Sequence, residues 1–277
     1  MCGATDGPEM YIADRLVYVE LQKTGCTHIG KLLAQVLPGE QIGKHNKPDA
    51  ELLGQQPVFV GSVRNPWAWY VSLWAYGCQQ EGMLHQALTH RCGSPRGLGW
   101  RAEPAYALRR WLHSFTQDSR SWQELYGDVQ NVGAFRTWLH YLHQWPRRWD
   151  SGEHFARHAC CRSVGLMTYR YLDFFCRGGF RSINDLEGLK RFNEEHNYIS
   201  HIIRTEKLEQ DLLAVLAAVD VSVSDEQRLL ILGGGRSNAS RGKRTAWQEY
   251  YDQTCIELVA QRDELIIERY GYAPPLL

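Results

Sequence analysis

The sequence lacks a net charge: 31 Lys and Arg balance 31 Asp and Glu among 277 residues. Proteins that bind nucleic acid or an anionic surface by long-range attraction normally carry a basic excess, so we expect no nucleic-acid partner. The sequence also lacks any run near the ~20 apolar residues of a transmembrane helix, so we expect no membrane span. A hydrophobic content of 44% remains ample for a folded core.

The eight cysteines lack the pattern of a disulfide framework. They form no C-x-x-C pair, and Cys160 and Cys161 are adjacent. His154 and His158 lie one helical turn apart nearby, but adjacent cysteines rarely ligate one ion, so we predict no metal site. The residues before Asp14 contain no apolar segment of the secretory type, and we therefore expect a reduced, cytoplasmic protein.

Strand and helix signals alternate along the chain. Residues 16–21 and 57–63 read as buried strands, and each precedes a helical pattern, with Ile29, Leu32 and Leu33 starting the first. Further helices are expected near 133–145, 165–177, 206–219 and 245–269, and a further strand at 200–205. This order predicts an α/β fold with a central parallel sheet flanked by helices.

The middle of the chain differs from its flanks. Residues 78–170 contain twelve Lys and Arg, seven Asp and Glu and seven His. This excess could favour an anionic glycan, and the tryptophans of this region could stack on sugars, although we expect Trp138 and Trp145 to be core residues. We predict one domain over 1–277, with a core of 15–77 and 165–277 and a helical insertion at about 78–164.

The loop after the first strand has the features of an anion site. It reads Lys23-Thr24-Gly25-Cys26-Thr27-His28, directly before a helix. Helix-start N–H groups and the helix dipole attract anions, and Gly25 lets the backbone approach one closely. Lys23 supplies a charge, and Thr24 and Thr27 supply hydroxyl donors.

Residues 25–31 also match the first seven positions of a nucleoside-triphosphate P-loop, G-x-x-x-x-G-K. The eighth position should be Ser or Thr, to hold magnesium, but Leu32 occupies it. Leu32 belongs to the apolar helix face, which puts Lys31 on the solvent side. The pattern therefore favours a magnesium-free loop that uses Lys23.

A second motif follows the second strand. Val63-Arg64-Asn65-Pro66 ends that strand, and Ser72 comes eight residues after Arg64. A strand's carboxyl end faces the crevice where α/β sheets bind ligands, and a guanidinium suits bidentate phosphate recognition. We expect Ser72, on a stripe of small residues, to admit a phosphate.

Together the two motifs resemble those of sulfotransferases that use 3'-phosphoadenosine 5'-phosphosulfate (PAPS). The 23–27 loop resembles that family's 5'-phosphosulfate loop, and 63–66 with Ser72 resembles its 3'-phosphate motif. Residues 203–208 and 238–272 are similar to later segments of carbohydrate-type members. His28 stands where a small hydroxyl residue is more usual, so the loop lacks a donor hydroxyl at that position.

The resemblance implies a P-loop nucleotide-kinase-like core, PAPS as co-substrate, no metal, and sulfuryl transfer to a hydroxyl of a carbohydrate or glycolipid. It implies this set of donor-binding residues: Lys23, Thr24, Gly25, Cys26, Thr27, His28, Arg64, Ser72, Arg241 and Lys243. The acceptor must lose a proton to a base, for which His45 is our first choice and His28 our second. We expect Glu206 to support the sheet rather than the chemistry.

Two other functions remain open. A P-loop small-molecule kinase would need a magnesium-binding hydroxyl, which Leu32 does not supply. A non-catalytic nucleotide-binding protein would bind the donor without transferring its sulfuryl group. The sequence does not specify the oligomeric state or which hydroxyl compound is the acceptor.

Overall fold

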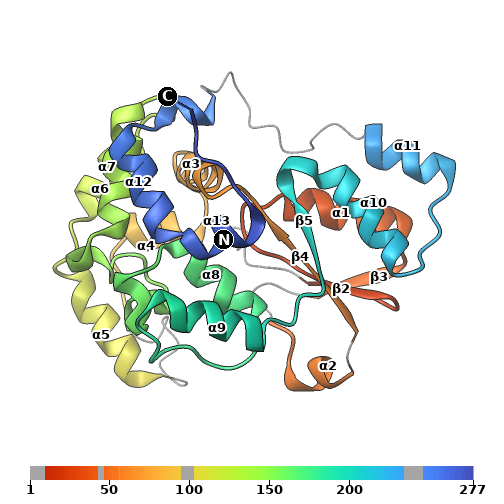
Figure 1. The fold of residues 1–277 in the computed structure, drawn as a ribbon. Helices are drawn as coiled ribbons and strands as arrows, with labels where there is room; N and C mark the ends of the chain where they lie inside the picture. The colour runs from red at the N-terminus through yellow and green to blue at the C-terminus, as the bar shows by residue number, and fades with distance from the viewer. Residues whose placement is uncertain (1–9, 43–46, 56, 95–102, 234–245, 277) are drawn as a thin grey trace. The chain divides into compact units, whose positions relative to one another are not determined.

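The structure is a computed structural model that describes residues 10–42, 47–55, 57–94, 103–233 and 246–276 (Figure 1). The chain divides into two compact units. The first comprises Met1–Asn65, Arg170–Gly179 and Arg191–Lys243. The second comprises Pro66–Tyr169, Phe180–Lys190 and Arg244–Leu277. Within the described ranges, no helix is both long and apolar enough to cross a bilayer.

A five-stranded sheet forms the centre of the first unit, in the order β3-β1-β2-β4-β5 (Figure 1). Its strands are β1 (Met10–Ala13), β2 (Leu16–Val19), β3 (Gly39–Ile42), β4 (Val58–Val63) and β5 (His201–Arg204). β2, β4 and β5 pair in parallel, whereas β1 pairs antiparallel with both β2 and β3. The predicted α/β class is confirmed.

The predicted central parallel sheet is present in part: β2, β4 and β5 are parallel, but the antiparallel pairing of β1 makes the whole sheet mixed. Only Asp14 and Arg15 separate β1 from β2, and so short a connection permits antiparallel pairing alone. β3 is exposed along its whole length, so it carries no run of apolar residues by which the sequence could reveal it.

Two helices, both predicted from their periodicity, cover one face of this sheet. They are α1 (Cys26–Val36) and α10 (Leu208–Ala218), and their buried leucines join one core cluster with Tyr18, Val60 and Ile203 of the strands. On β4, Gly61 lies against the Phe175 ring, where an added Cβ would stand 2.8 Å from Cζ. Phe59 of the same strand contacts Tyr198 edge-on, with ring centroids 5.0 Å apart.

The second unit is helical and rich in aromatic side chains. Its longest helices are α3 (Pro66–Gly77) and α7 (Val132–His143). The rings of Trp74, Phe135 and Tyr250 meet in edge-on contacts, with centroids 5.4–5.7 Å apart. Trp138 is fully buried, as predicted, but Trp145 is 38% exposed. Trp145 lies beyond the end of α7, in the 3-10 turn η2 (Trp145–Arg147), and so leaves the buried face of α7.

The remaining helices of the chain have eleven residues or fewer. They are α2 (Ala50–Gly54), α4 (Met83–Thr89), α5 (Pro104–Ser114), α6 (Ser119–Leu125), α8 (Leu166–Phe175), α9 (Leu186–His196), α11 (Asp225–Gly233), α12 (Gln253–Arg262) and α13 (Glu264–Tyr270), with 3-10 turns η3 (His154–Arg157), η4 (Ala159–Arg162), η5 (Thr205–Lys207) and η6 (Trp247–Tyr250).

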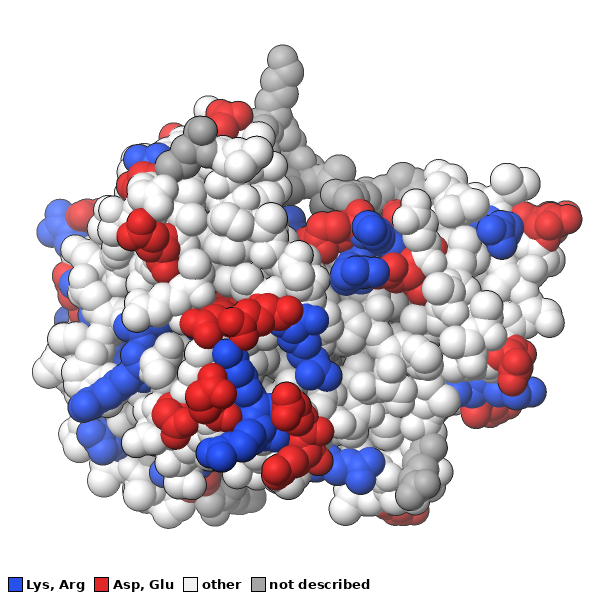
Figure 2. Space-filling model, viewed as in Figure 1, with Lys and Arg blue, Asp and Glu red and all other residues white. Residues whose placement is uncertain are grey.

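Over α9, acidic and basic side chains are interleaved (Figure 2). Lys190 of this helix contacts Glu187, and also Glu264 and Glu268 of α13.

The predicted single helix over 245–269 is wrong, because Asp263 separates α12 from α13. Asp263 is fully buried, and its carboxylate accepts hydrogen bonds from the Thr168 N–H (2.9 Å) and hydroxyl (2.8 Å). The Tyr70 hydroxyl donates to the same carboxylate at 2.8 Å. Breaking the helix turns this carboxylate inward, where it caps the start of α8.

Burial of Asp263 raises the pKa of its carboxyl to about 6, although the hydrogen bonds from Tyr70 and Thr168 oppose the shift. The folded unit therefore holds this proton more tightly than the unfolded chain does. The contribution of Asp263 to stability is greatest below pH 4 and declines as the pH rises toward and through the folded pKa, near 6.

We expect the free energy of unfolding of the second unit to fall, relative to Asp263→Asn, by about 2–3 kcal/mol between pH 4 and pH 7. Urea denaturation followed by tryptophan fluorescence measures this, since all ten tryptophans lie in that unit. Asp225→Asn, which changes an exposed aspartate of α11, is the control. If the free energy of unfolding changed with pH in the same way for wild type and Asp263→Asn, the raised pKa of Asp263 would be contradicted.

Candidate functional site

The candidate site begins with the loop between β2 and α1. Two residues of this loop have left-handed backbone, Lys23 with φ +64° and Gly25 with φ +85°. Gly25 is the N-cap of α1, and its carbonyl accepts hydrogen bonds from the N–H groups of His28 and Ile29, both at 3.0 Å. The first N–H groups of a helix lack acceptors within the helix, and α1 has no acidic residue in its first turn. The loop therefore presents positive potential without a carboxylate in that turn to oppose it.

The side chain of Thr24 is part of the scaffold of this loop. It is fully buried, and its hydroxyl lies 2.5 Å from the Leu21 carbonyl oxygen, to which it donates, and 2.6 Å from the Ser62 hydroxyl. Ser62 Oγ also lies 2.7 Å from the Tyr18 hydroxyl. These bonds join β2 to β4, and the proton of the Thr24 hydroxyl is donated to the Leu21 carbonyl oxygen.

Arg64 reaches the loop from the end of the neighbouring strand. The parallel register pairs Val19 of β2 with Gly61 of β4, so residues after 19 and residues after 61 emerge at the same edge of the sheet. Arg64 Nη1 donates to the Lys23 carbonyl oxygen at 3.3 Å. The structure thus brings together two predicted motifs that are about 40 residues apart in the sequence.

The end of β5 completes this edge. Thr205 Oγ1 lies 2.8 Å from the Thr24 carbonyl oxygen and 2.9 Å from that of Val63. Glu206 accepts a hydrogen bond from the Asn65 N–H at 2.7 Å, which gives it the supporting position expected from the sequence. Thr205 was not expected to hold the site. The signal that could have identified it is its place directly after the third parallel strand.

The other residues of the loop differ in exposure. Thr27 is exposed, Cys26 is partly buried and His28 is buried on α1. Burial, with a further contribution from the Glu20 carboxylate, raises the pKa of the Cys26 thiol to about 12. Cys26 is therefore a neutral thiol near pH 7 and does not act as a thiolate nucleophile.

Glu20 is a buried acid beside the loop. It is only 2% exposed, and its carboxylate lies 3.4 Å from Gln41 Nε2 of β3. The same carboxylate oxygen would stand 3.5 Å from a Cβ on Gly30 of α1. The absent side chain at Gly30 therefore leaves room for Glu20 between the sheet and the helix.

The orientation of α1 bears on the choice between nucleotide loops. Lys31 is exposed and Leu32 is buried, as the helical pattern predicts. Lys31, the lysine of the apparent P-loop motif, therefore points to solvent. Leu32, at the eighth position of that motif, points into the core. Among the described residues, no group of three or more His, Cys, Asp or Glu is arranged to hold a metal ion.

Four predicted residues cannot be compared with this geometry. Ser72 lies on α3, in the second unit, and its side chain is half-buried. His45, Arg241 and Lys243 lie outside the described residues. The predicted base His45 and the predicted nucleotide-covering loop remain predictions.

No protein-family model, no curated protein and no solved structure matches this chain.

Gly25→Ala should destabilise the first unit by about 1–2 kcal/mol, because an L side chain is strained at this φ. Its Cβ would also stand 3.0 Å from Leu208 Cδ1. Gly54→Ala is the control, since an added Cβ there meets nothing within 4 Å. Hydrogen exchange of the β2 and α1 amides measures the change. Equal protection in the two variants would show that the loop tolerates a side chain at Gly25.

Proposed function

We propose that this chain transfers a sulfuryl group from PAPS to an acceptor hydroxyl on a carbohydrate or glycolipid. The observation that carries the proposal is the contact of Arg64 Nη1 with the Lys23 carbonyl, which puts both predicted phosphate motifs at one edge of the sheet. A donor with phosphates at both its 5' and 3' positions needs two cationic sites held at a fixed separation. The chain would accordingly use β2, α1 and β4 as a nucleotide-kinase-like core.

In the proposed reaction, the acceptor oxygen attacks sulfur in line with the bond to the 5'-phosphate. The bond from sulfur to that phosphate oxygen breaks, and adenosine 3',5'-bisphosphate leaves with the bonding electrons. Lys23 and the N–H groups at the start of α1 stabilise the negative charge that develops on the leaving oxygen. Arg64 holds the 3'-phosphate, and Ser72 stays the second contact of that phosphate that the sequence predicts.

The acceptor proton must pass to a base. His45 and His28 are the proposed candidates, and His28 lies in the first turn of α1, beside the loop. Thr24 contributes through its backbone, because its hydroxyl is bonded to Leu21 and Ser62.

The kinase alternative is less well supported by this geometry. A magnesium-dependent loop requires a hydroxyl at position 32 and a lysine directed at the phosphates. Leu32 is 4% exposed within the core, and Lys31 points to solvent.

We expect wild-type protein to bind adenosine 3',5'-bisphosphate without magnesium, and Arg64→Ala to lose about 1.5–3 kcal/mol of binding free energy. Isothermal titration calorimetry measures both. Arg15→Ala removes the same charge at the opposite end of β2 and should bind like wild type. Binding of ATP with magnesium but not of the bisphosphate would overturn the proposal in favour of the kinase.

Lys23→Met should lower the rate of sulfuryl transfer at least about tenfold, because it removes the charge that stabilises the leaving oxygen. Transfer of labelled sulfate from PAPS to a mixture of glycans measures the rate. Addition of EDTA should leave the wild-type rate unchanged. Intact bisphosphate binding with no transfer to glycan, phenol or steroid acceptors would instead identify a non-catalytic nucleotide-binding protein.

A further inference from the structure

Helix α5 of the second unit has its apolar side chains on the outside. Leu108, Leu112 and Phe115 follow one another at i, i+4 and i+7, which puts them on one stripe of the helix. They are 41%, 53% and 55% exposed. The opposite side of the helix is buried and contains Arg110 and Ser114, which are 3% and 0% exposed. This arrangement is the reverse of an ordinary surface helix, whose apolar stripe faces the core.

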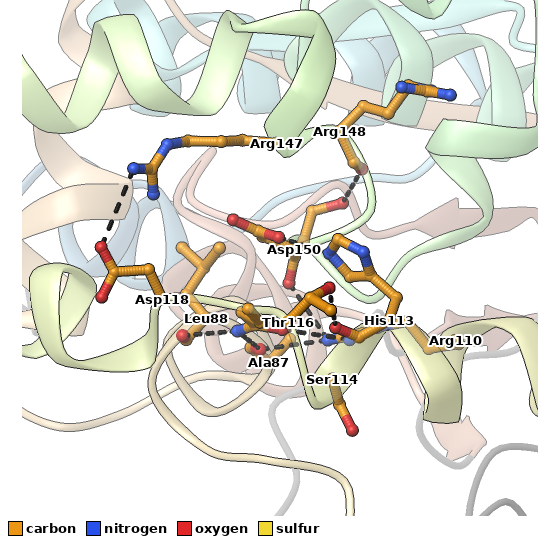
Figure 3. A network of polar contacts seen from close by, with 12 residues as sticks. Ala87, Leu88, Arg110, His113, Ser114, Thr116, Asp118, Arg147, Arg148 and Asp150 are labelled. Carbon is orange, nitrogen blue, oxygen red and sulfur yellow. Dashed lines mark hydrogen bonds and ion pairs between the residues drawn. The ribbon is translucent and has the colours of Figure 1, made fainter.

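A network of polar contacts fixes this orientation (Figure 3). Arg110 donates to the carbonyl oxygens of Ala87 (3.1 Å) and Asp150 (3.2 Å) and to Gln117 Oε1 (3.1 Å). His113 Nε2 lies 2.6 Å from Asp150 Oδ1, and the Trp122 N–H donates to the other carboxylate oxygen at 2.9 Å. Rotating α5 to bury its leucines would break these contacts. The charge of Arg110 would then be exposed, or it would stay buried without hydrogen-bond partners. The apolar stripe is thus held outward by the fold.

Arg109 borders this stripe. Arg109, the exposed neighbour of Leu108, lies with Cζ 4.5 Å from the Trp149 ring centroid. Beyond it, Arg148 and Arg162 both stack on the exposed Trp145 ring, with Cζ 3.4 and 3.7 Å from its centroid. Burial, together with repulsion from Arg109 and Arg162, lowers the pKa of Arg148.

The three arginines have no acidic partner within the described ranges. The ion pairs of this unit engage other arginines instead, such as Arg147 with Asp118 at 4.0 Å and Arg157 with Glu103. Clustered like charges disfavour the folded state unless an anion offsets their repulsion. The cluster is therefore complementary to an anionic surface.

We propose that this face of the second unit, formed by α5 and the Trp145 turn, binds to membranes that contain anionic lipids. The stripe of Leu108, Leu112 and Phe115 enters the boundary between headgroups and acyl chains, while Arg109, Arg148 and Arg162 contact lipid phosphates. Trp145 has the mixed apolar and polar character of a side chain at that boundary. The chain lies on the membrane and does not span it.

Other occupants fit this face less well. A symmetric dimer would place the arginine clusters of both copies within one interface, because an isologous interface uses the same patch of each subunit. A water-soluble polyanion would engage the arginines but leave the leucines and the phenylalanine exposed. An anionic bilayer offers acyl chains to the apolar stripe and lipid phosphates to the arginines at the same time.

Flotation with vesicles tests the proposal. Wild type should float with vesicles of phosphatidylcholine and phosphatidylserine, less so in high salt, and not with phosphatidylcholine alone. The double variants Leu112→Ser/Phe115→Ser and Arg109→Glu/Arg162→Glu should each reduce the partition coefficient about tenfold or more. Because all four side chains project outward, circular dichroism should show folded variants.

Two double variants are matched controls. Leu229→Ser/Leu232→Ser removes leucines of α11 that are 71% and 50% exposed, and Arg15→Glu/Arg191→Glu reverses two exposed charges of the first unit. Both should float like wild type, as should Arg64→Ala, which separates this proposal from that of the donor site.

Three results would overturn the proposal. The first is no flotation of wild type with either vesicle. The second is equal loss in the control and test variants. The third is binding to soluble heparin, or formation of a dimer that Leu112→Ser/Phe115→Ser abolishes, without flotation.

Discussion

The parallel pairing of β2, β4 and β5 is the constraint on which the candidate site depends. Because parallel strands end at one edge, three segments from distant parts of the sequence meet there. The Thr205 hydroxyl lies within hydrogen-bond distance of carbonyl oxygens that follow β2 and end β4, and Glu206 accepts the Asn65 N–H. The resulting backbone geometry holds the Lys23 carbonyl against Arg64. A ligand at this edge would meet a frame whose polar groups are already bonded to one another.

The second unit depends on buried polar side chains in a different way. Asp263 ends one helix and caps another, and Asp150 and Arg110 fix the rotation of α5. In both places a charged group is buried with several hydrogen-bond partners, which compensates part of its cost of desolvation. The consequence for α5 is that specific polar contacts, rather than apolar burial, determine which of its faces is exposed. This unit therefore exposes an apolar stripe that amphipathic patterning alone would have turned inward.

Where local patterns carried the information, the sequence predicted the structure well. The buried positions of α1 and α10, the strands β2, β4 and β5, and the outward direction of Lys31 all follow from side-chain spacing. The prediction failed where a partner far along the chain supplies the reason. β3 is exposed and forms only by pairing with β1, α12 ends because Asp263 bonds Thr168 and Tyr70, and Trp145 stacks on Arg148 and Arg162 rather than in the core.

By itself, the sequence determined the α/β class, the loop at Lys23 and Gly25, and the place of Arg64 at the end of a strand, because each is a local property of a few neighbouring residues. Only the tertiary structure decided that Arg64 meets the loop, that the Thr24 hydroxyl is bonded inside the sheet, and that the leucines of α5 face outward. Those outcomes depend on hydrogen bonds between residues far apart in the chain, for which a single sequence contains no periodic signal.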